Sequence, residues 1–251
     1  RSLRVRDLLP RLTTTQNAIE FVKENVFTNA ASPVAEANAK AESALTFTID
    51  SAPVRTIAHW IPATRQVLDD WSQLLSYIDT RLIEGLKDKE DSELLTGDGL
   101  GVHISGLITE ATAYDTALNV ASDTRIDKLR HALRQIRASD LEADGIILHP
   151  NDWEVIELIK TEEGGANKGV YIMGGPASTS APRIWSKPVA TTTAMTSGKF
   201  LVGDFRMGCA VFDRMDARID VSTEHSDYFT KNMVAIRAEE RLALAVYRPT
   251  S

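Results

Sequence analysis

The segment at residues 28–43 places the strongest constraint on how this chain folds. It is small and polar and lacks large apolar residues, so it cannot bury a core of its own. Two strand-like runs follow it, at 44–49 and 54–61, separated by a short stretch that ends at Pro53. We interpret residues 28–58 as a long hairpin that projects from a body. Because such a projection has no core of its own, it must be stabilised by contact with a partner.

The sequence after the hairpin changes to helical spacing. Over residues 70–95, apolar side chains recur every three or four positions: Trp71, Leu74, Leu75, Ile78, Leu82 and Leu86. This periodicity predicts one long amphipathic helix, close to 40 Å at 1.5 Å per residue. The glycine-rich stretch 97–101 ends it. A helix of this length predicts an elongated molecule.

The remainder of the chain mixes both kinds of element. We expect a helix over 124–138 capped by Asp123 or Thr124, a buried strand at 145–148, and a helix over 152–160 capped by Asn151. Residues 164–169 predict a loop. Strand signals then dominate, at 199–202, 209–212, 217–221 and 233–247. The fold class is therefore mixed α+β, without regular strand–helix alternation.

No residue set predicts an active site. The five histidines are scattered, no nucleophile motif surrounds the single cysteine Cys209, and neighbouring Glu239 and Glu240 on a strand would point to opposite faces. The net charge of −7 and pI near 5.3 argue against a protein whose main function is to bind the phosphate backbone of nucleic acids. No apolar run is long enough to span a membrane. We therefore expect no cofactor, no metal site, no membrane contact and no enzyme.

Several strings of this sequence point to one family. They are residues 43–47, 52–70, 94–99, 212–217 and 232–245. In order and over nearly the whole chain, with one insertion around 165–169, they closely resemble the major capsid proteins of tailed bacteriophages of the Hong Kong 97 type. A long collinear match of this kind is far more specific than a short motif.

The resemblance implies the Hong Kong 97 type capsid fold, with a peripheral domain, a long spine helix, an extended loop hairpin and an axial domain. It places the end of an N-terminal arm and the start of the peripheral domain at 1–27 and the extended loop at 28–58. The peripheral domain with its spine helix follows at 59–105, and the axial domain at 106–205. Peripheral strands occupy 206–245, and 246–251 return to the axial domain. A removable scaffold segment is expected before Arg1.

The same resemblance implies a structural subunit of an icosahedral capsid that encloses phage DNA. Its expected partners are copies of itself in hexamers and pentamers, a portal, decoration proteins, and double-stranded DNA contacted weakly and without sequence preference. The expected location is the virion capsid, assembled in the host cytoplasm. Alternatives with the same fold are the shell of a nanocompartment or of a gene-transfer particle. A soluble metabolic enzyme is the alternative from another class.

Some members of this family join their subunits by isopeptide bonds. The resemblance assigns Lys40 as the nucleophile on the extended loop, Asn232 as the amide acceptor and Glu239 as the base, with Val34 and Met215 lining the site. A neutral amine must attack, and burial against apolar groups favours loss of its proton. The primary amide then releases ammonia, while a carboxylate accepts the proton.

One position of this cross-link pocket departs from the family. Arg237 stands where the family example has an apolar residue, and on a regular strand it points to the same face as Glu239. Its guanidinium would pair with the carboxylate and weaken the base, although it would also disfavour a protonated lysine. The alternative is that Lys40 is a solvated loop residue, Asn232 a turn residue and Glu239 a structural ion-pair partner.

Overall fold

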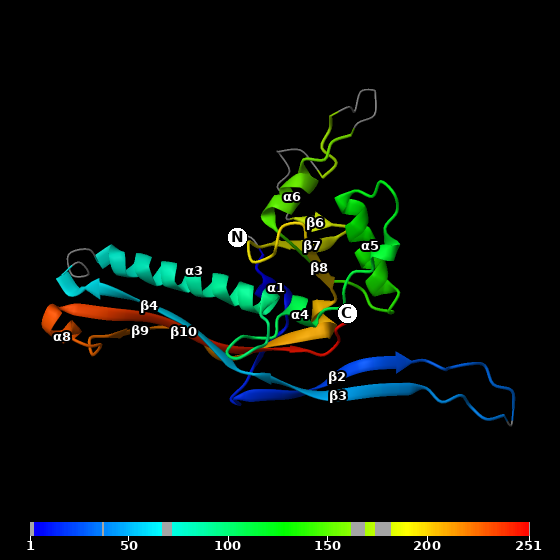
Figure 1. Ribbon diagram of the computed structural model, residues 1–251, viewed down its shortest axis with the longest axis horizontal. Coiled ribbons are helices and arrows are strands. Elements are labelled where there is room, and N and C mark those ends of the chain that lie inside the picture. Colours follow the sequence, from blue (N-terminus) through cyan, green and yellow to red (C-terminus); the bar gives the residue numbers. More distant parts are fainter. Residues whose placement is uncertain (1–2, 37, 67–71, 162–168, 174–181, 251) are drawn as a thin grey trace.

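The computed structural model describes residues 3–36, 38–66, 72–161, 169–173 and 182–250. Trp71 and most of the expected loop at 164–169 lie outside the described residues. The fold is mixed α+β, as expected. A long sheet with one helix forms an arm, a hairpin extends to the opposite side, and a second domain rises above their junction (Figure 1). The molecule is elongated, as the helix length predicted. Its division into peripheral and axial domains stays a prediction.

The long arm is a helix laid on a four-stranded sheet. The strand order is β1 (Arg11–Thr13), β9 (Cys209–Ser222), β10 (Met233–Val246) and β4 (Arg55–Thr64). β1 runs parallel to β9, and the other pairs are antiparallel. Leu82 and Leu86 of α3 (Ser72–Thr96) pack on alternate β10 residues such as Ile236. The predicted apolar stripe is confirmed there, whereas Leu75 is exposed.

Gly97, which follows the last residue of α3, occupies a position where a side chain would not fit. A Cβ atom on Gly97 would lie 2.1 Å from the carbonyl oxygen of Ile104 and 2.6 Å from that of Glu93. The carboxylate of Glu93 meanwhile accepts a hydrogen bond from the Ile104 amide at 3.2 Å. These contacts fold the chain back against the helix end, so the stretch is a turn, as predicted.

The hairpin begins earlier than the expected residue 28. It consists of β2 (Ala18–Thr28) and β3 (Ala44–Pro53), paired antiparallel from Ala18 opposite Pro53 to Thr28 opposite Ala44. The run expected as its second strand at 54–61 is instead β4, which pairs with β10. Pro53 has no amide hydrogen to continue the ladder, and the amide of Val54 donates to the carbonyl of Asn17 at 2.9 Å. The chain leaves the hairpin at this point.

The second domain is built on a sheet in the order β6 (Arg183–Ile184), β7 (Lys187–Thr191), β5 (Gly145–Leu148) and β8 (Phe200–Gly203). Helix α5 (Arg125–Arg137) is capped by Thr124, as predicted. Helix α6 (Pro150–Glu157) starts before the expected residue 152 and is capped by His149 rather than Asn151, because proline suits the first helical position. The strands expected at 209–212 and 217–221 form one strand, β9.

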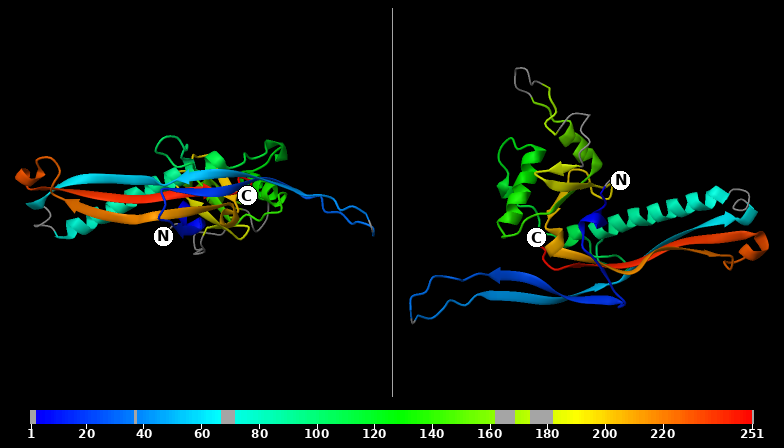
Figure 2. Two further views of the ribbon diagram at one scale, coloured as in Figure 1. Left: turned by 90° about the horizontal axis from the view of Figure 1, so that it is seen from below. Right: turned by 180° about the vertical axis from the view of Figure 1, so that it is seen from behind.

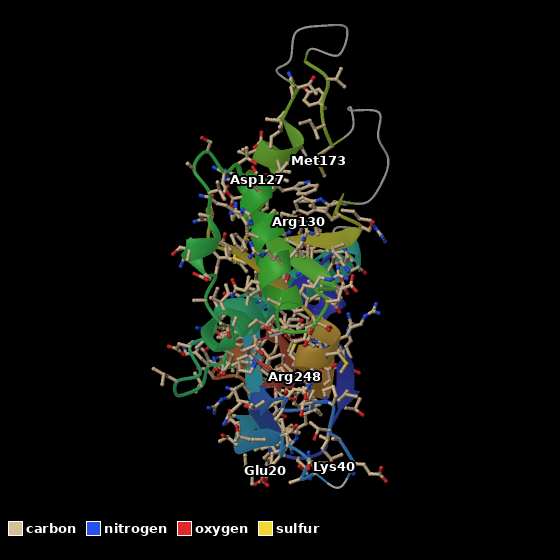
Figure 3. All side chains as sticks on the ribbon, turned by 90° about the vertical axis from the view of Figure 1, so that its right-hand side faces the viewer. Glu20, Lys40, Asp127, Arg130, Met173 and Arg248 are labelled. Carbon is tan, nitrogen blue, oxygen red and sulfur yellow. The ribbon has the colours of Figure 1, made fainter. Side chains whose placement is uncertain are left out.

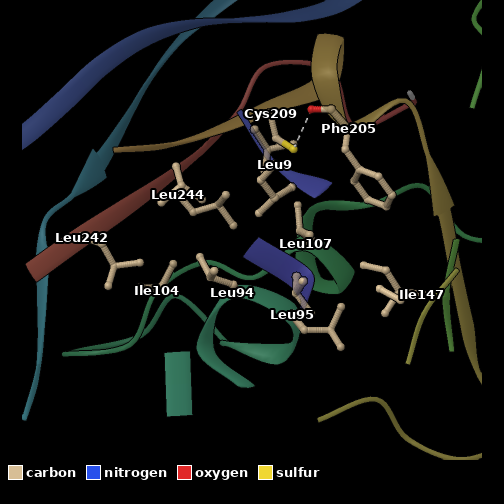
Figure 4. Packing of buried hydrophobic residues seen from close by; sticks show 14 of the residues in the cluster. Leu9, Leu94, Leu95, Ile104, Leu107, Ile147, Phe205, Cys209, Leu242 and Leu244 are labelled. Atoms are coloured by element: carbon tan, nitrogen blue, oxygen red, sulfur yellow. Dashed lines mark hydrogen bonds between the residues drawn. The ribbon is translucent and has the colours of Figure 1, made fainter. Parts of the chain in front are cut away.

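The largest core joins the arm to the second domain (Figure 4). Leu94 and Leu95 from the end of α3 pack there with Ile147 of β5, while Ile146 and Leu148 face the second domain's own core. Cys209 is buried in the junction and its thiol donates to the carbonyl of Phe205 at 3.3 Å. Burial raises the pKa of Cys209 to about 12, so the thiol stays protonated at neutral pH.

Short helical elements complete the chain. They are α1 (Val5–Leu8), α4 (Leu107–Glu110), the 3-10 helix η1 (Thr116–Leu118), α7 (Phe205–Gly208) and α8 (Tyr228–Lys231). None of the described helices is both long and apolar enough to cross a membrane.

Candidate assembly and cross-linking surfaces

One face of the hairpin is apolar and open to solvent. Side chains at alternate positions of β3 share a face, which brings together Leu45, Phe47 and Ile49 with exposed fractions of 46%, 56% and 79%. Val22 of β2 lies directly opposite Ile49 and is 52% exposed. Full burial of four such side chains would be worth roughly 6–12 kcal/mol. An isolated two-stranded hairpin gains none of this.

The hairpin is held to the body only at its base. The ring of Phe21 meets Tyr247 edge-on with centroids 5.5 Å apart. Lys23 pairs with Glu110 at 2.5 Å, and the guanidinium of Arg248 pairs with Glu24 at 2.6 Å. These contacts fix the direction of the hairpin, and among the described residues no ion pair or ring contact joins its outer half to the body of the same subunit.

Lys40 lies at the outer end of this hairpin. Figure 3 looks onto that end and labels the residue. Lys40 is exposed, and neither a hydrogen bond nor an ion pair joins it to another described residue. Val34 lies on the same tip and is 38% exposed. Within one subunit, Lys40 is therefore a solvated loop lysine with a freely available amine.

Asn232 lies at the far end of the long arm, immediately after α8. Its backbone is left-handed, with φ 52°, and its amide donates to the carbonyl of Tyr228. Asparagine is one of the few residues that tolerate this conformation at a helix end. The carboxamide is exposed, and its backbone carbonyl accepts from the amide of Arg65 at 2.8 Å. Asn232 is thus a turn residue whose side chain is open to another molecule.

Glu239 is half-buried on β10 and is paired with Arg237, as the sequence predicted. Their side chains approach to 3.2 Å, and Arg237 also contacts Asp220 at 3.0 Å. The hydrogen bond to Asp220 and the charge of Glu239 raise the pKa of Arg237. Met215 of β9 lies opposite Arg241, beside this part of β10.

One subunit does not bring Lys40, Asn232 and Glu239 together. Asn232 and Glu239 are seven residues apart along an extended strand, which corresponds to roughly 23 Å. Lys40 extends from the other side of the molecule (Figure 1). Any reaction among the three therefore requires neighbouring subunits.

Glu240 belongs to a buried charged network. Arg6 of α1 bridges Glu90 of α3 and Asp213 of β9. Glu240 lies beside them, only 4% exposed, and its Oε1 has no hydrogen-bond partner among the described residues. Together with Met215, these side chains line a cavity of about 260 Å³. Glu239 and Glu240 point to opposite faces of β10, as predicted.

The network contains more carboxylates than cations. Burial, followed by the charges of Glu90 and Asp213, raises the pKa of Glu240 from 4.5 to about 8, against the opposing charge of Arg6. Burial also raises the pKa of Glu90. One carboxyl of the network therefore holds a proton at neutral pH. In the described part of the chain, no group of three or more His, Cys, Asp or Glu residues is arranged to hold a metal ion.

The comparisons with known proteins decide the family. The profile of the phage capsid family matches residues 1–251. The chain belongs to this family.

This capsid-family chain spans only part of the length of its relatives. It is 50% identical over 251 residues to the major capsid protein of Enterobacteria phage HK97, covering all of this chain and 64% of that protein. The fold is similar to the capsid of a native GTA particle, with a TM-score of 0.73 and 15% identity over 99% of this chain and 87% of the other. It is also similar to Phage G capsid proteins, with a TM-score of 0.76 and 9% identity over 99% and 87%.

A pH dependence of stability follows from the buried network of this capsid-family chain. With a pKa near 8, Glu240 keeps its proton in the folded state between about pH 5 and 8, where the unfolded chain releases it. The free energy of unfolding should therefore fall by about 2–3 kcal/mol between pH 6 and 9. Glu240→Gln should match the natural chain only near pH 4, below the unfolded pKa of the carboxyl, and exceed it by a margin that grows from pH 6 to pH 9. Urea unfolding of unassembled subunits measures this, and parallel pH profiles of the two proteins would contradict it.

Proposed function

We propose that this chain is the shell-forming part of a major capsid protein, which assembles with copies of itself into the icosahedral capsid of a tailed phage around its DNA. The observation that carries the proposal is the exposed apolar face of the hairpin, formed by Val22, Leu45, Phe47 and Ile49. Patches of this kind mark interaction sites. Half of the sequence is identical to a protein named as a major capsid protein, and this supports a second copy of the chain as the partner.

The finer parts of the proposal concern symmetry and other partners. Hexamers and pentamers are expected because closed shells need rings, and the GTA particle capsid is described with C5 symmetry. A portal and decoration proteins are further proposed partners; the Phage G capsid proteins are described together with decoration proteins. DNA contact is proposed to be weak and non-specific because the net charge is −7. The proposed location is the virion capsid, after assembly in the host cytoplasm.

Electron microscopy of the protein, expressed alone or with an upstream scaffold segment, tests this function. Uniform icosahedral shells are the expected result. A protein that is well folded and monomeric under all conditions would overturn the proposal. The nucleic acid inside purified particles separates two of the shells that share the fold: a complete phage genome supports the phage capsid, and random host fragments support a gene-transfer particle.

We further propose that neighbouring subunits form Lys40–Asn232 isopeptide bonds. The amine nitrogen of Lys40 attacks the carboxamide carbon of Asn232, a new amide bond forms, and ammonia leaves. Glu239 of a third subunit accepts a proton from the attacking amine and returns it to the departing nitrogen, which leaves as ammonia. The exposed Lys40 and Asn232 side chains support this, since neither side chain is bonded to another described residue of its own subunit. The ion pair of Glu239 with Arg237 is the feature that opposes it, because the guanidinium occupies the carboxylate that must accept the proton.

Cross-linking predicts a ladder of covalent oligomers when shells are boiled in detergent. Lys40→Arg, Asn232→Asp and Glu239→Gln should each yield monomers only, whereas Glu36→Gln on the same hairpin tip should leave the ladder intact. Mass spectrometry should show the loss of one ammonia for each Lys40–Asn232 link. Shells of the natural chain that dissolve entirely to monomers would show that the bonds do not form.

A further inference from the structure

Helix α5 carries a stripe of three arginines without ion-pair partners among the described residues of its own subunit, although the charge of Arg137 acts at longer range on Glu142. Arg130, Arg134 and Arg137 are spaced by four and three residues, which places them on one face of the helix. All three are exposed, and none forms an ion pair with a described carboxylate. The guanidinium of Arg130 lies over the ring of Trp185, 5.9 Å from its centroid. Like charges at this spacing repel one another along a helix.

Two charges in the first turn of α5 are already engaged. Arg125 contacts Asp152 at 2.6 Å, and the carboxylate of Asp127 accepts the backbone amide of Thr124 in a capping box at 2.9 Å. The arginine stripe is thus what remains after local pairing. Its positive charge is concentrated on a chain whose net charge is −7.

Helix α6 presents the opposite charge. Glu154 and Glu157 are three residues apart, so they adjoin on the helix surface, and both are exposed. Neither has an ion-pair partner among the residues that the structure describes. Lys160, the next cation along the chain, lies over the ring of Tyr171, 4.7 Å from its centroid.

These two charged surfaces lie on two helices of one domain that meet near their N-terminal ends, where Arg125 contacts Asp152, and each occupies its own part of the domain surface. Helix α5 lies beside the turn that joins β6 to β7, where Trp185 is found, whereas α6 lies towards the other end of the same strands (Figures 1 and 2). Arg130 and Asp127 face the viewer when the molecule is seen from the α5 side (Figure 3). A ring of identical subunits is closed by contacts between two different surfaces of each copy. This arrangement supplies such a pair.

We propose that the arginine stripe of α5 binds Glu154 and Glu157 on α6 of the adjacent copy in a capsomer ring. The inference rests on the proposed self-assembly and names the surfaces that close the ring. Complementary charges of this kind steer subunits together and set the register of the contact. Because the side chains lie at the surface, added salt weakens the contact.

Charge reversal tests the contact. R130E/R134E and E154R/E157R should each lower the yield of shells about tenfold or more in low salt, since each places like charges face to face. The chain that carries all four substitutions should assemble again. K128E, an exposed lysine on another side of α5, is the matched control and should assemble normally. Thermal unfolding of each variant confirms that it is folded.

Mixing the two reversed variants gives a sharper result. In a ring where they alternate, every α5 surface meets an α6 surface of opposite charge. Alternation closes only in rings with an even number of subunits. The mixture should therefore form hexamers, visible by native mass spectrometry, without pentamers or closed shells.

The possible outcomes distinguish a failure of the α5–α6 contact from a failure of the proposed function on which it rests. If the natural chain forms no shells, the proposed function fails. If the natural chain assembles and both reversed variants assemble equally well, the α5–α6 contact is wrong. If R130E/R134E assembles normally but loses binding to a DNA duplex or to heparin, the stripe is a polyanion surface and the contact is again overturned.

Discussion

Replacing both Phe47 and Ile49 with aspartate is expected to abolish shell assembly and leave the subunit folded. The two side chains are 56% and 79% exposed, so the free subunit loses little packing when they change. In a shell, the same face must be covered by a neighbour, and each buried unpaired carboxylate would cost several kcal/mol. Because a shell repeats this contact in every subunit, assembly should stop rather than slow.

Size-exclusion chromatography and electron microscopy measure this effect. Thr48→Asp is the matched control, since Thr48 lies between Phe47 and Ile49 on the opposite face of β3 and is also exposed. It should assemble, and all variants should melt within a few degrees of the natural subunit. Normal shells from the Phe47/Ile49 variant would show that this apolar face is not an assembly surface.

Local sequence patterns predicted the elements whose determinants lie close together in the chain. The stripe containing Leu82 and Leu86 and the capping residue Thr124 each act within one or two helical turns, so both helices were predicted well. The start of the hairpin was missed because Ala18 pairs with Pro53 across the whole loop. A regular alternation shows that a strand exists but does not show its partner.

The sequence predicted the cross-link residues, whereas it did not predict the buried charged network, for the same reason. The resemblance to the capsid family assigned Lys40, Asn232 and Glu239, and the Arg237–Glu239 pair followed from strand alternation alone. Arg6, by contrast, meets partners 84 and 207 residues away in the sequence. No local pattern predicts such a contact. The available signal was the charged run Glu239, Glu240 and Arg241 in a strand whose last five residues are all apolar.

Arg6→Met is expected to lower the free energy of unfolding by about 3–5 kcal/mol, because it removes the cation from a buried site and leaves the carboxylates behind. Glu90 and Glu240 are only 2% and 4% exposed, so most of the surface of both carboxyl side chains would stay out of contact with solvent. Arg11→Met is the matched control: Arg11 comes from the same segment, is half-exposed and pairs with Asp7 at 2.8 Å. Its loss should cost less than about 1 kcal/mol.

Urea unfolding of unassembled subunits at pH 7 measures both variants. Adding Glu90→Gln to Arg6→Met should recover part of the loss, since the second change removes a charge that the first leaves unpaired. Equal effects of Arg6→Met and Arg11→Met would show that the network does not hold the N-terminal segment. A large effect confined to Arg6 would mean that one buried cation joins the N-terminal segment to α3 and to the long sheet. Any movement of the N-terminal segment away from the arm must then also break the pairs of Arg6 with Glu90 and Asp213.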